Sequence, residues 1–322
     1  MIRPSAFSAL PSVLSSALLA SLLLAAPAQA KESCPAPPQP PTQDQMAGYM
    51  KAAKDRGALW TIEKDGRASY LYGTIHIGRM PWMFPGPKMM AALQGVGALA
   101  VEVDVTAPDT RPQMMAAMAA AAPLALTDAD RARLAKLLEA ECLPAGALDA
   151  LHPVMQVITI SALIGRRDGL YPEFSQESKL TGIARAANRP VVALESIALQ
   201  MGVLLPRDAA EARTAFDEGL RDLEAPDVRQ KMQHLADVWE RGDLEAMDTV
   251  EEVCQCQPTA RQREFYRALN DDRNPGIARR IAEEHAKGVP VLAAVGILHM
   301  TGEKAIPKLL AEQGFKVTRV AY

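Results

Sequence analysis

The chain has 322 residues, a net charge of -3 at neutral pH and a hydrophobic content of 49%. This length is enough for one large domain or two ordinary ones, with a substantial core. A pI near 6.0 leaves no basic field, so the composition argues against nucleic acid as a partner.

The first 30 residues have the order of a secretory signal peptide. Arg3 supplies a positive charge, residues 13–26 form an apolar run, and Ala28-Gln29-Ala30 is a small-x-small cleavage site. The apolar run is shorter than the roughly 20 residues of a membrane anchor. We expect cleavage after Ala30 and a periplasmic or secreted mature chain with no membrane anchor. The predicted organisation is a signal peptide (1–30), a proline-rich linker (31–43) and a single domain (44–322).

The cysteines are Cys34, Cys142, Cys254 and Cys256. An even number of cysteines in an exported chain favours disulfides. Several pairings are open, and we expect Cys142 to pair with Cys254 or Cys256, which would tie two helical segments together. A Cys-x-Cys metal site is the weaker interpretation, because the sequence has no histidine or second cysteine pair near it.

Hydrophobic periodicity predicts an α/β fold with a central mixed β-sheet, flanking helices and a large helical insert. Strands are expected at 58–63, 68–76, 98–104, 190–195, 289–295 and 315–320. Asp65-Gly66, between the first two strands, is a hairpin signal. Helices are expected at 44–54, 88–94, 128–141, 154–164, 175–188, 276–287 and 302–313. The insert, 196–267, is expected to be a solvated helical region with Trp239 and Met247 on its inner face.

Two of the predicted strands end in the same motif. Gly73 and Gly296 each follow a β-prone run, and each is followed three residues later by a histidine, His76 or His299. Ligands of open α/β sheets bind beyond the carboxyl ends of the strands, so we expect the two histidines to share a site. A glycine at this spacing would allow close approach of backbone or ligand, or would supply a positive φ for a turn.

Carboxylates end two other strands. Alternation places Glu102 and Asp104 side by side on one face, and Glu195 ends the strand at 190–195. Two imidazoles with carboxylates and no thiolate form a nitrogen and oxygen ligand set that suits Zn, Mn, Co or Fe. The sequence therefore predicts a metal site, although a hydrogen-bonded structural role is the common one for a single strand-end histidine.

Other residues are candidates for contacts with a substrate. Arg273, beside Asn274, offers a planar cation that would hold a carboxylate or stabilise developing negative charge. Trp82 lies in a proline-rich segment after His76, and its ring either lines a pocket or packs onto the core. The remaining histidines, His152, His234 and His285, are expected to be structural or solvent-facing.

These motifs resemble the TraB/PrgY/GumN family over about 58–320. The resemblance rests on Leu59-Trp60-Thr61-Ile62, 70–78, Val101-Glu102-Val103-Asp104, 190–195, Asp272-Arg273-Asn274, 295–299 and Gly314-Phe315-Lys316-Val317. That family is related to the Tiki metalloproteases, which use Mn or Co, and more distantly to erythromycin esterases and haem-binding ChaN-like proteins. The resemblance implies a single α/β domain whose site is formed by His76, His299 and Glu102, with Arg273 at the motif arginine.

One segment departs from the family pattern. Before the helix that leads to Pro190, family members tend to carry a glycine, an aliphatic residue and an acid. This chain has Phe174-Ser175-Gln176-Glu177 there, and Glu177 is the candidate replacement for the acid.

The residues and the resemblance together favour an exported metal-dependent hydrolase that acts on peptide bonds or another small-molecule substrate. The predicted metal is Mn, Co or Zn. The predicted ligands are His76, His299 and Glu102; the predicted catalytic residues are Glu102, Arg273 and Glu195; and the predicted substrate contacts are Asn274, Asp104 and Trp82. The alternatives are a non-catalytic periplasmic protein that binds a peptide or a haem-like ligand, and a scaffold with a vestigial site.

Overall fold

A computed structural model describes residues 34–35, 37–249 and 259–322 of the chain. The predicted signal peptide, Cys254 and Cys256 lie outside the described residues. Within these ranges no helix is both long enough and apolar enough to cross a membrane.

The centre of the fold is a six-stranded mixed sheet with the order β4-β3-β5-β2-β1-β6. The strands are β1 (Ala58–Lys64), β2 (Arg67–Thr74), β3 (Ala98–Val101), β4 (Val191–Ala193), β5 (Val291–Gly296) and β6 (Lys316–Arg319). Strands β4, β3, β5 and β2 are parallel, and β1 is antiparallel to both β2 and β6. The predicted mixed sheet is confirmed, and its four parallel strands end at one edge.

Local sequence explains two of these elements. Asp65 and Gly66 have φ of 52° and 73°, which is the two-residue hairpin that Asp-Gly predicts between β1 and β2. In β5, residues 291–295 are all buried, as expected of a parallel strand that is covered on both faces.

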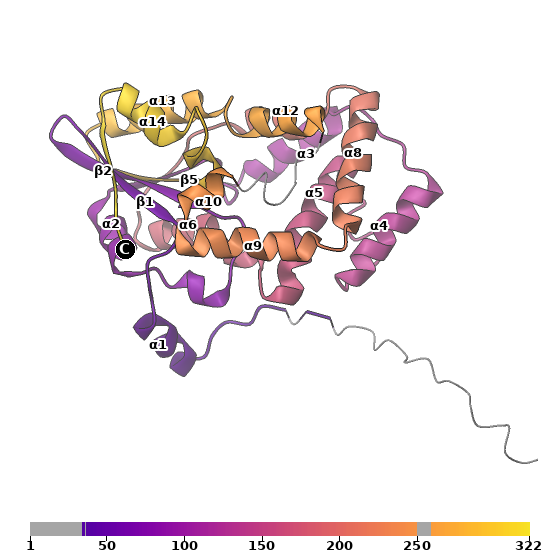
Figure 1. Cartoon of the computed structure of the whole chain (residues 1–322), viewed down its shortest axis with the longest axis horizontal. Helices are drawn as coiled ribbons and strands as arrows, with labels where there is room; N and C mark the ends of the chain where they lie inside the picture. Colours follow the sequence, from indigo (N-terminus) through magenta and orange to yellow (C-terminus); the bar gives the residue numbers. More distant parts are fainter. Residues whose placement is uncertain (1–33, 36, 250–258) are drawn as a thin grey trace, which may run out of the picture. The chain divides into compact units, whose positions relative to one another are not determined.

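Helices lie on both sides of the sheet (Figure 1), with α13 and α14 on one side and α2 and α6 on the other. Their bounds are α2 (Pro87–Gly95), α6 (Gln176–Ala186), α13 (Asn274–Ala286) and α14 (Ile306–Glu312). Each of α2, α13 and α14 carries a proline in its first turn, where the missing N–H breaks no helical hydrogen bond. Their buried side chains join those of the strands in one large apolar cluster.

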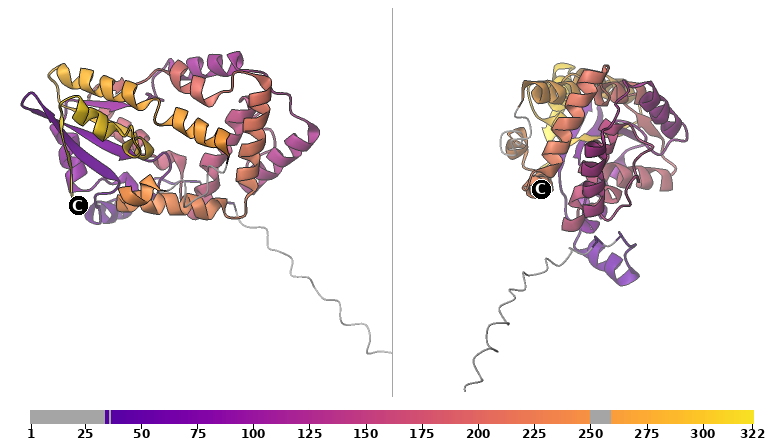
Figure 2. Two further views of the ribbon diagram at one scale, coloured as in Figure 1. Left: turned by 45° about the horizontal axis from the view of Figure 1, so that its top comes forward. Right: turned by 90° about the vertical axis from the view of Figure 1, so that its right-hand side faces the viewer.

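The remaining helices pack into a helical part that lies beside the sheet in the left view of Figure 2 and in front of it in the right view. They are α3 (Thr110–Ala120), α4 (Asp128–Ala140), α5 (Pro153–Leu163), α7 (Ile197–Leu204), α8 (Ala209–Glu224), α9 (Val228–Arg241), α10 (Leu244–Asp248) and α12 (Ala260–Leu269). Short 3₁₀ turns are η1 (Met80–Met83), η2 (Ile164–Asp168), η3 (Pro172–Phe174) and η4 (Ile297–Met300), and α1 (Gln43–Lys51) has no buried side chain.

The helical part differs from the solvated insert that was expected over 196–267. Phe216 and Leu220 of α8 are fully buried, and they share an apolar cluster with Ile160 of α5. The many charged residues of α8 led to the prediction of a solvated helix, because its apolar side chains occupy only one face. Trp239 and Met247 are buried as predicted.

The disulfide joins Cys34 to Cys142, so the predicted partner of Cys142 was wrong. Cys142 directly follows the C-cap of α4 in a left-handed conformation, with φ of 58°. Residues 34–35 and 37–42 belong to no helix or strand, and the disulfide holds Cys34 at this helix end. The spacing of the cysteines along the sequence does not distinguish Cys34 from Cys254 or Cys256 as the partner of Cys142.

Removing this disulfide is expected to lower the free energy of unfolding by about 2–4 kcal/mol, because the bond closes a long loop of the unfolded chain. The loop is long, since the two cysteines are 108 positions apart. Urea unfolding of Cys34→Ser/Cys142→Ser against the parent measures the loss. Coincident transitions of the oxidised parent and the double variant would contradict the prediction.

A partly buried ion pair in the helical part predicts a pH effect. Asp130 of α4 accepts hydrogen bonds from Arg213 at 2.8 and 3.2 Å and from the amide of Thr127 at 2.9 Å. The bond from Arg213 is the main cause that lowers the pKa of Asp130 to about 2. A lowered pKa stabilises the fold above the carboxyl's unfolded pKa, and that stability is lost as the pH falls through the folded pKa.

We therefore expect Asp130→Asn to be less stable than the parent by about 2 kcal/mol at pH 6, a difference that shrinks as the pH falls from about 4 toward 2. Asparagine keeps an acceptor for the Thr127 amide, so the variant removes mainly the charge. Urea unfolding at a series of pH values checks this. A stability difference that does not change with pH would contradict it.

Candidate functional site

The candidate site lies at the edge where the parallel strands end. Thr74, the last residue of β2, pairs with Gly296, the last residue of β5, so both Gly-x-x-His motifs leave the sheet together. His76 lies two residues past β2, and His299 lies in η4 directly after β5. Glu102 is the first residue after β3, and its Oε1 accepts the Gly296 amide at 2.8 Å.

The two motif glycines allow close approach, which is one of the two roles expected for them. Neither belongs to the described glycines with positive φ. A Cβ on Gly73 would clash with the side chain of Ile297. A Cβ on Gly296 would lie 3.3 Å from Oε1 of Glu102, 3.6 Å from Cδ2 of His299 and 4.0 Å from Nε2 of His76. The two histidines and the glutamate therefore converge on the backbone of Gly296.

His299 is held in one orientation by Asn274. The ring is buried, and its Nδ1 lies 2.5 Å from Oδ1 of Asn274. The Asn274 amide nitrogen donates to the carbonyl of Lys304 at 2.9 Å, so its Oδ1 must accept from Nδ1–H of the histidine. Nε2 then carries no proton and lies 3.8 Å from Oε2 of Glu102. Burial lowers the pKa of His299 to about 4, which keeps the ring neutral.

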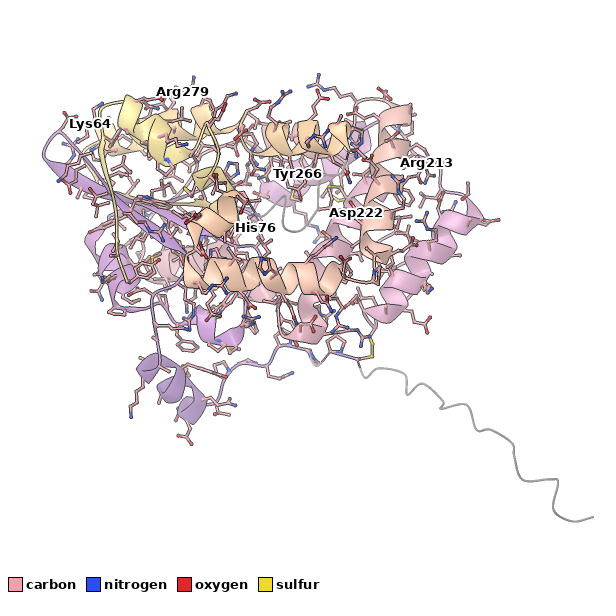
Figure 3. The ribbon with its side chains drawn as sticks, viewed as in Figure 1. Lys64, His76, Arg213, Asp222, Tyr266 and Arg279 are labelled. Carbon is pink, nitrogen blue, oxygen red and sulfur yellow. A yellow bond between two sulfur atoms is a disulfide. The ribbon has the colours of Figure 1, made fainter. Side chains whose placement is uncertain are left out.

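His76 is anchored in the same way by a different element. Its Nδ1 lies 3.1 Å from Oε1 of Glu177, the second residue of α6, and this oxygen also accepts from the hydroxyl of Thr74. The His76 side chain is 73% exposed, so solvent reaches the ring. Attraction to the carboxylate of Glu177 raises the pKa of His76. Figure 3 labels this histidine near the junction of the sheet and the helical part.

Glu102 is ionised in spite of its burial. Burial alone would raise its pKa, but His299, His76, Arg273 and the Gly296 amide favour the charged form and lower the pKa to about 2. Its Oε2 accepts from Nη2 of Arg273 at 2.6 Å. The carboxylate is therefore a fixed negative charge between two imidazoles.

Arg273 and Glu195 support this carboxylate from behind. Nε of Arg273 donates to both carboxylate oxygens of Glu195 at 3.1 Å, and Nη1 donates to the carbonyl of Leu269 at 2.8 Å. The side chains of Arg273 and Glu195 are only 5% and 4% exposed. Burial raises the pKa of Glu195, and Arg273 opposes this rise. This arrangement favours a positioning role for both residues over the predicted contact of Arg273 with a substrate.

Two predicted substrate contacts lie elsewhere. The sequence predicted Asp104 beside Glu102 on one face of a strand. Strand β3 ends at Val101, before both residues, so Asp104 lies in the turn that follows. It accepts from Arg185 at 2.7 Å and from the hydroxyl of Thr106 at 2.7 Å. Trp82 is buried in the core, with its ring 4.8 Å from that of Trp239. The sequence left open whether the Trp82 ring lines a pocket or packs onto the core, and in the structure it packs onto the core.

Asn274, the third predicted substrate contact, is fully buried and orients His299 instead. Glu177 was named only as a replacement acid, and its contact with His76 was not predicted. It lies 101 positions further along the chain, and local periodicity carries no signal for such a pairing. The departure from the family pattern at 174–177 was the one feature that pointed to it.

The other histidines are structural or solvent-facing, as predicted. His285 is buried, with Nδ1 2.8 Å from the Ser69 hydroxyl and Nε2 3.1 Å from the carbonyl of Lys64. His152 caps α5 by accepting from the amide of Val154. His234 is exposed on α9.

His76, His299 and Glu102 carry nitrogen and oxygen donors of the types that divalent transition metals prefer. Histidines that bind metals usually engage the other ring nitrogen with a carboxylate or a carbonyl, as both do here with Glu177 and Asn274. The 3.8 Å between Nε2 of His299 and Oε2 of Glu102 exceeds a hydrogen bond, and it is within the roughly 4 Å that can separate two ligands with bonds of about 2 Å to one ion.

The site is not closed around such an ion. Among residues 34–35, 37–249 and 259–322, no three His, Cys, Asp or Glu side chains lie close enough together to hold a metal as they stand. Both oxygens of Glu102 are engaged, by the Gly296 amide and by Arg273. A carboxylate oxygen has further lone pairs, so a bound ion would share Glu102 with these donors after a small side-chain movement.

Comparison with curated proteins and with solved structures gave no significant match. The model of one family does match, over residues 58–319. This range contains all six strands and every residue of the site described above. The chain therefore belongs to the TraB/PrgY/gumN family.

Proposed function

We propose that this protein is an exported metal-dependent hydrolase that cleaves peptide bonds. One observation carries the proposal: both motif histidines use Nδ1 for a protein partner at the carboxyl edge of the sheet. Nε2 of His299 lies 3.8 Å from Oε2 of Glu102, and Nε2 of His76 lies near the backbone of Gly296. His76, His299 and Glu102 would hold one divalent ion, for which Mn, Co and Zn are the candidates.

When bound, such an ion supplies Lewis-acid chemistry by lowering the pKa of a coordinated water and polarising a carbonyl. The protein supplies the rest. Asn274 keeps Nε2 of His299 free of its proton, and Glu177 orients the ring of His76. Arg273 neutralises part of the charge on Glu102 and fixes its direction.

The substrate would approach from the side of His76, the most exposed member of the site. Glu102 is buried, and Arg273 and Glu195, which contact each other, line a different cavity. In this arrangement Glu177 accepts a hydrogen bond from Nδ1–H of His76, and Glu102 serves as ligand or base. Glu195 acts through Arg273 and not on the substrate.

Export is the second component of the proposal. The N-terminal order of charge, apolar run and cleavage site supports it. The disulfide between Cys34 and Cys142 gives independent support, because such bonds persist in oxidising compartments. N-terminal sequencing of the chain recovered from outside the cytoplasm tests this, with Lys31 as the expected first residue.

A peptidase screen tests the activity. The mature chain is offered a peptide library after treatment with chelator and after addition of Mn, Co or Zn. We expect cleavage that chelator abolishes and at least one metal restores, loss of cleavage in His76→Ala, and full cleavage in His234→Ala, which changes an exposed histidine outside the site. Cleavage that survives in His76→Ala would contradict the assigned site.

A further inference from the structure

A cavity of about 440 Å³ lies between the helices of the helical part. Helices α5, α7, α8, α9 and α12 supply its walls. Much of the wall is apolar, with Val157, Ala215, Met232, Leu235 and Phe265 among the lining residues. Its volume lies within the roughly 300–1,000 Å³ that is typical of ligand pockets, and it exceeds that of any amino-acid side chain.

The cavity adjoins the candidate site. Ile77 and Leu298 line it, and these residues are the chain neighbours of His76 and His299. Figure 3 labels Tyr266 and Asp222 of the cavity wall, with His76 toward the sheet in that view. A group that fills the cavity would therefore place its polar end close to the two imidazoles.

Charged side chains of the wall already have protein partners. Glu218 accepts from Nε of Arg261 at 2.6 Å, and Asp222 accepts from Gln262 at 3.1 Å. Lys231 pairs with Asp227 at 3.1 Å. Much of the remaining wall is apolar, so a peptide backbone in the cavity would find few partners there for its N–H and C=O groups, and burial of unpaired groups is costly. A hydrocarbon chain carries no such cost.

We propose that this cavity binds the acyl chain of an acylated substrate, and that the acylated end lies beside His76 and His299. Binding of the chain rests on the cavity alone, whereas cleavage next to it rests on the proposed function. The substrate class that follows is an N-acylated peptide or a similar acyl amide. Apolar contact with the cavity would select the chain, and the sheet edge would hold the bond to be cleaved.

Fluorescence titration with dansyl-undecanoic acid tests the binding step. We expect saturable binding by the parent, competition by lauric acid, and at least about tenfold weaker binding in Ala215→Phe, which fills the cavity from α8. Ala209→Phe is the matched control, because Ala209 is exposed on the same helix. If Ala215→Phe fails to fold, Ser161→Leu fills the cavity from α5.

The outcomes separate this inference from the hydrolase proposal. Absence of binding by the parent, unchanged binding in the filled variants, or stronger competition by an apolar acetylated peptide than by lauric acid would overturn the acyl assignment. Probe binding without any peptide cleavage would contradict the hydrolase proposal and support the binding of an acyl chain in the cavity.

Discussion

Replacing Arg273 with methionine is expected to lower the free energy of unfolding by about 3–5 kcal/mol, because the change leaves buried carboxylates without their cation. Arg273 donates to both Glu102 and Glu195, and all three side chains are less than one-tenth exposed. Methionine keeps most of the side-chain volume, so the decrease in the free energy of unfolding reflects mainly the loss of the positive charge of Arg273. Urea unfolding at pH 7 measures it.

The same helix offers the matched control. Arg279 of α13 is 77% exposed and pairs with Glu283 at 3.7 Å. Exposed pairs of this kind contribute about 0–1 kcal/mol, so Arg279→Met should unfold almost like the parent. Equal unfolding of the two variants would show that the Arg273 network is not the buried support described here.

Single substitutions of the motif histidines are expected to weaken binding of Mn, Co or Zn by more than about 100-fold, beyond the roughly 10–100-fold typical of losing an outer partner of a ligand. His76→Ala removes an exposed ring and should leave the fold intact. His299→Ala empties a buried position and also frees Asn274. Calorimetric titration of each apo variant measures the affinity.

His234→Ala controls for nonspecific binding to surface imidazoles, because His234 is exposed on α9. Asn274→Ala provides a graded comparison: it removes only the partner of His299 and should cost less affinity than His299→Ala. Retention of parental affinity in His76→Ala would remove this residue from the ligand set.

Much of the sheet could be predicted from sequence, because strand signals are local. The Asp65-Gly66 turn between β1 and β2 and the continuous apolar run of β5 each specify their element without help from distant residues. Strand ends were less predictable. Parallel pairing stops at Thr74 and Gly296, so β2 ends two residues before His76 although the alternating pattern continues.

The site was predictable where it depends on strand ends and not where it depends on packing. Four of the predicted residues meet because parallel strands end at one edge: His76, His299, Glu102 and Glu195. Arg273 joins them from the N-cap of α13. Asp104 does not join them, because β3 ends early. Glu177 contacts His76, and Cys34 is bonded to Cys142, although the members of each pair lie far apart in the sequence. Hydrophobic periodicity does not predict such long-range contacts.

The helical part shows the same limit. The sequence of α8 is rich in charge, and its partner α5 precedes it by more than one helix. Only tertiary packing brings Phe216 to Ile160 and leaves the cavity between these helices and α9. The size of this cavity depends on how whole helices cross, so no single sequence motif predicts it.

Elemental analysis of the mature chain is the most direct test of the metal site. The protein, from Lys31 to Tyr322, is incubated with Mn, Co or Zn, desalted and compared with His76→Ala/His299→Ala treated in the same way. The account predicts close to one metal ion per parent chain and loss of that metal from a double variant that remains folded. A parent that retains no metal, or a double variant that retains as much, would contradict it.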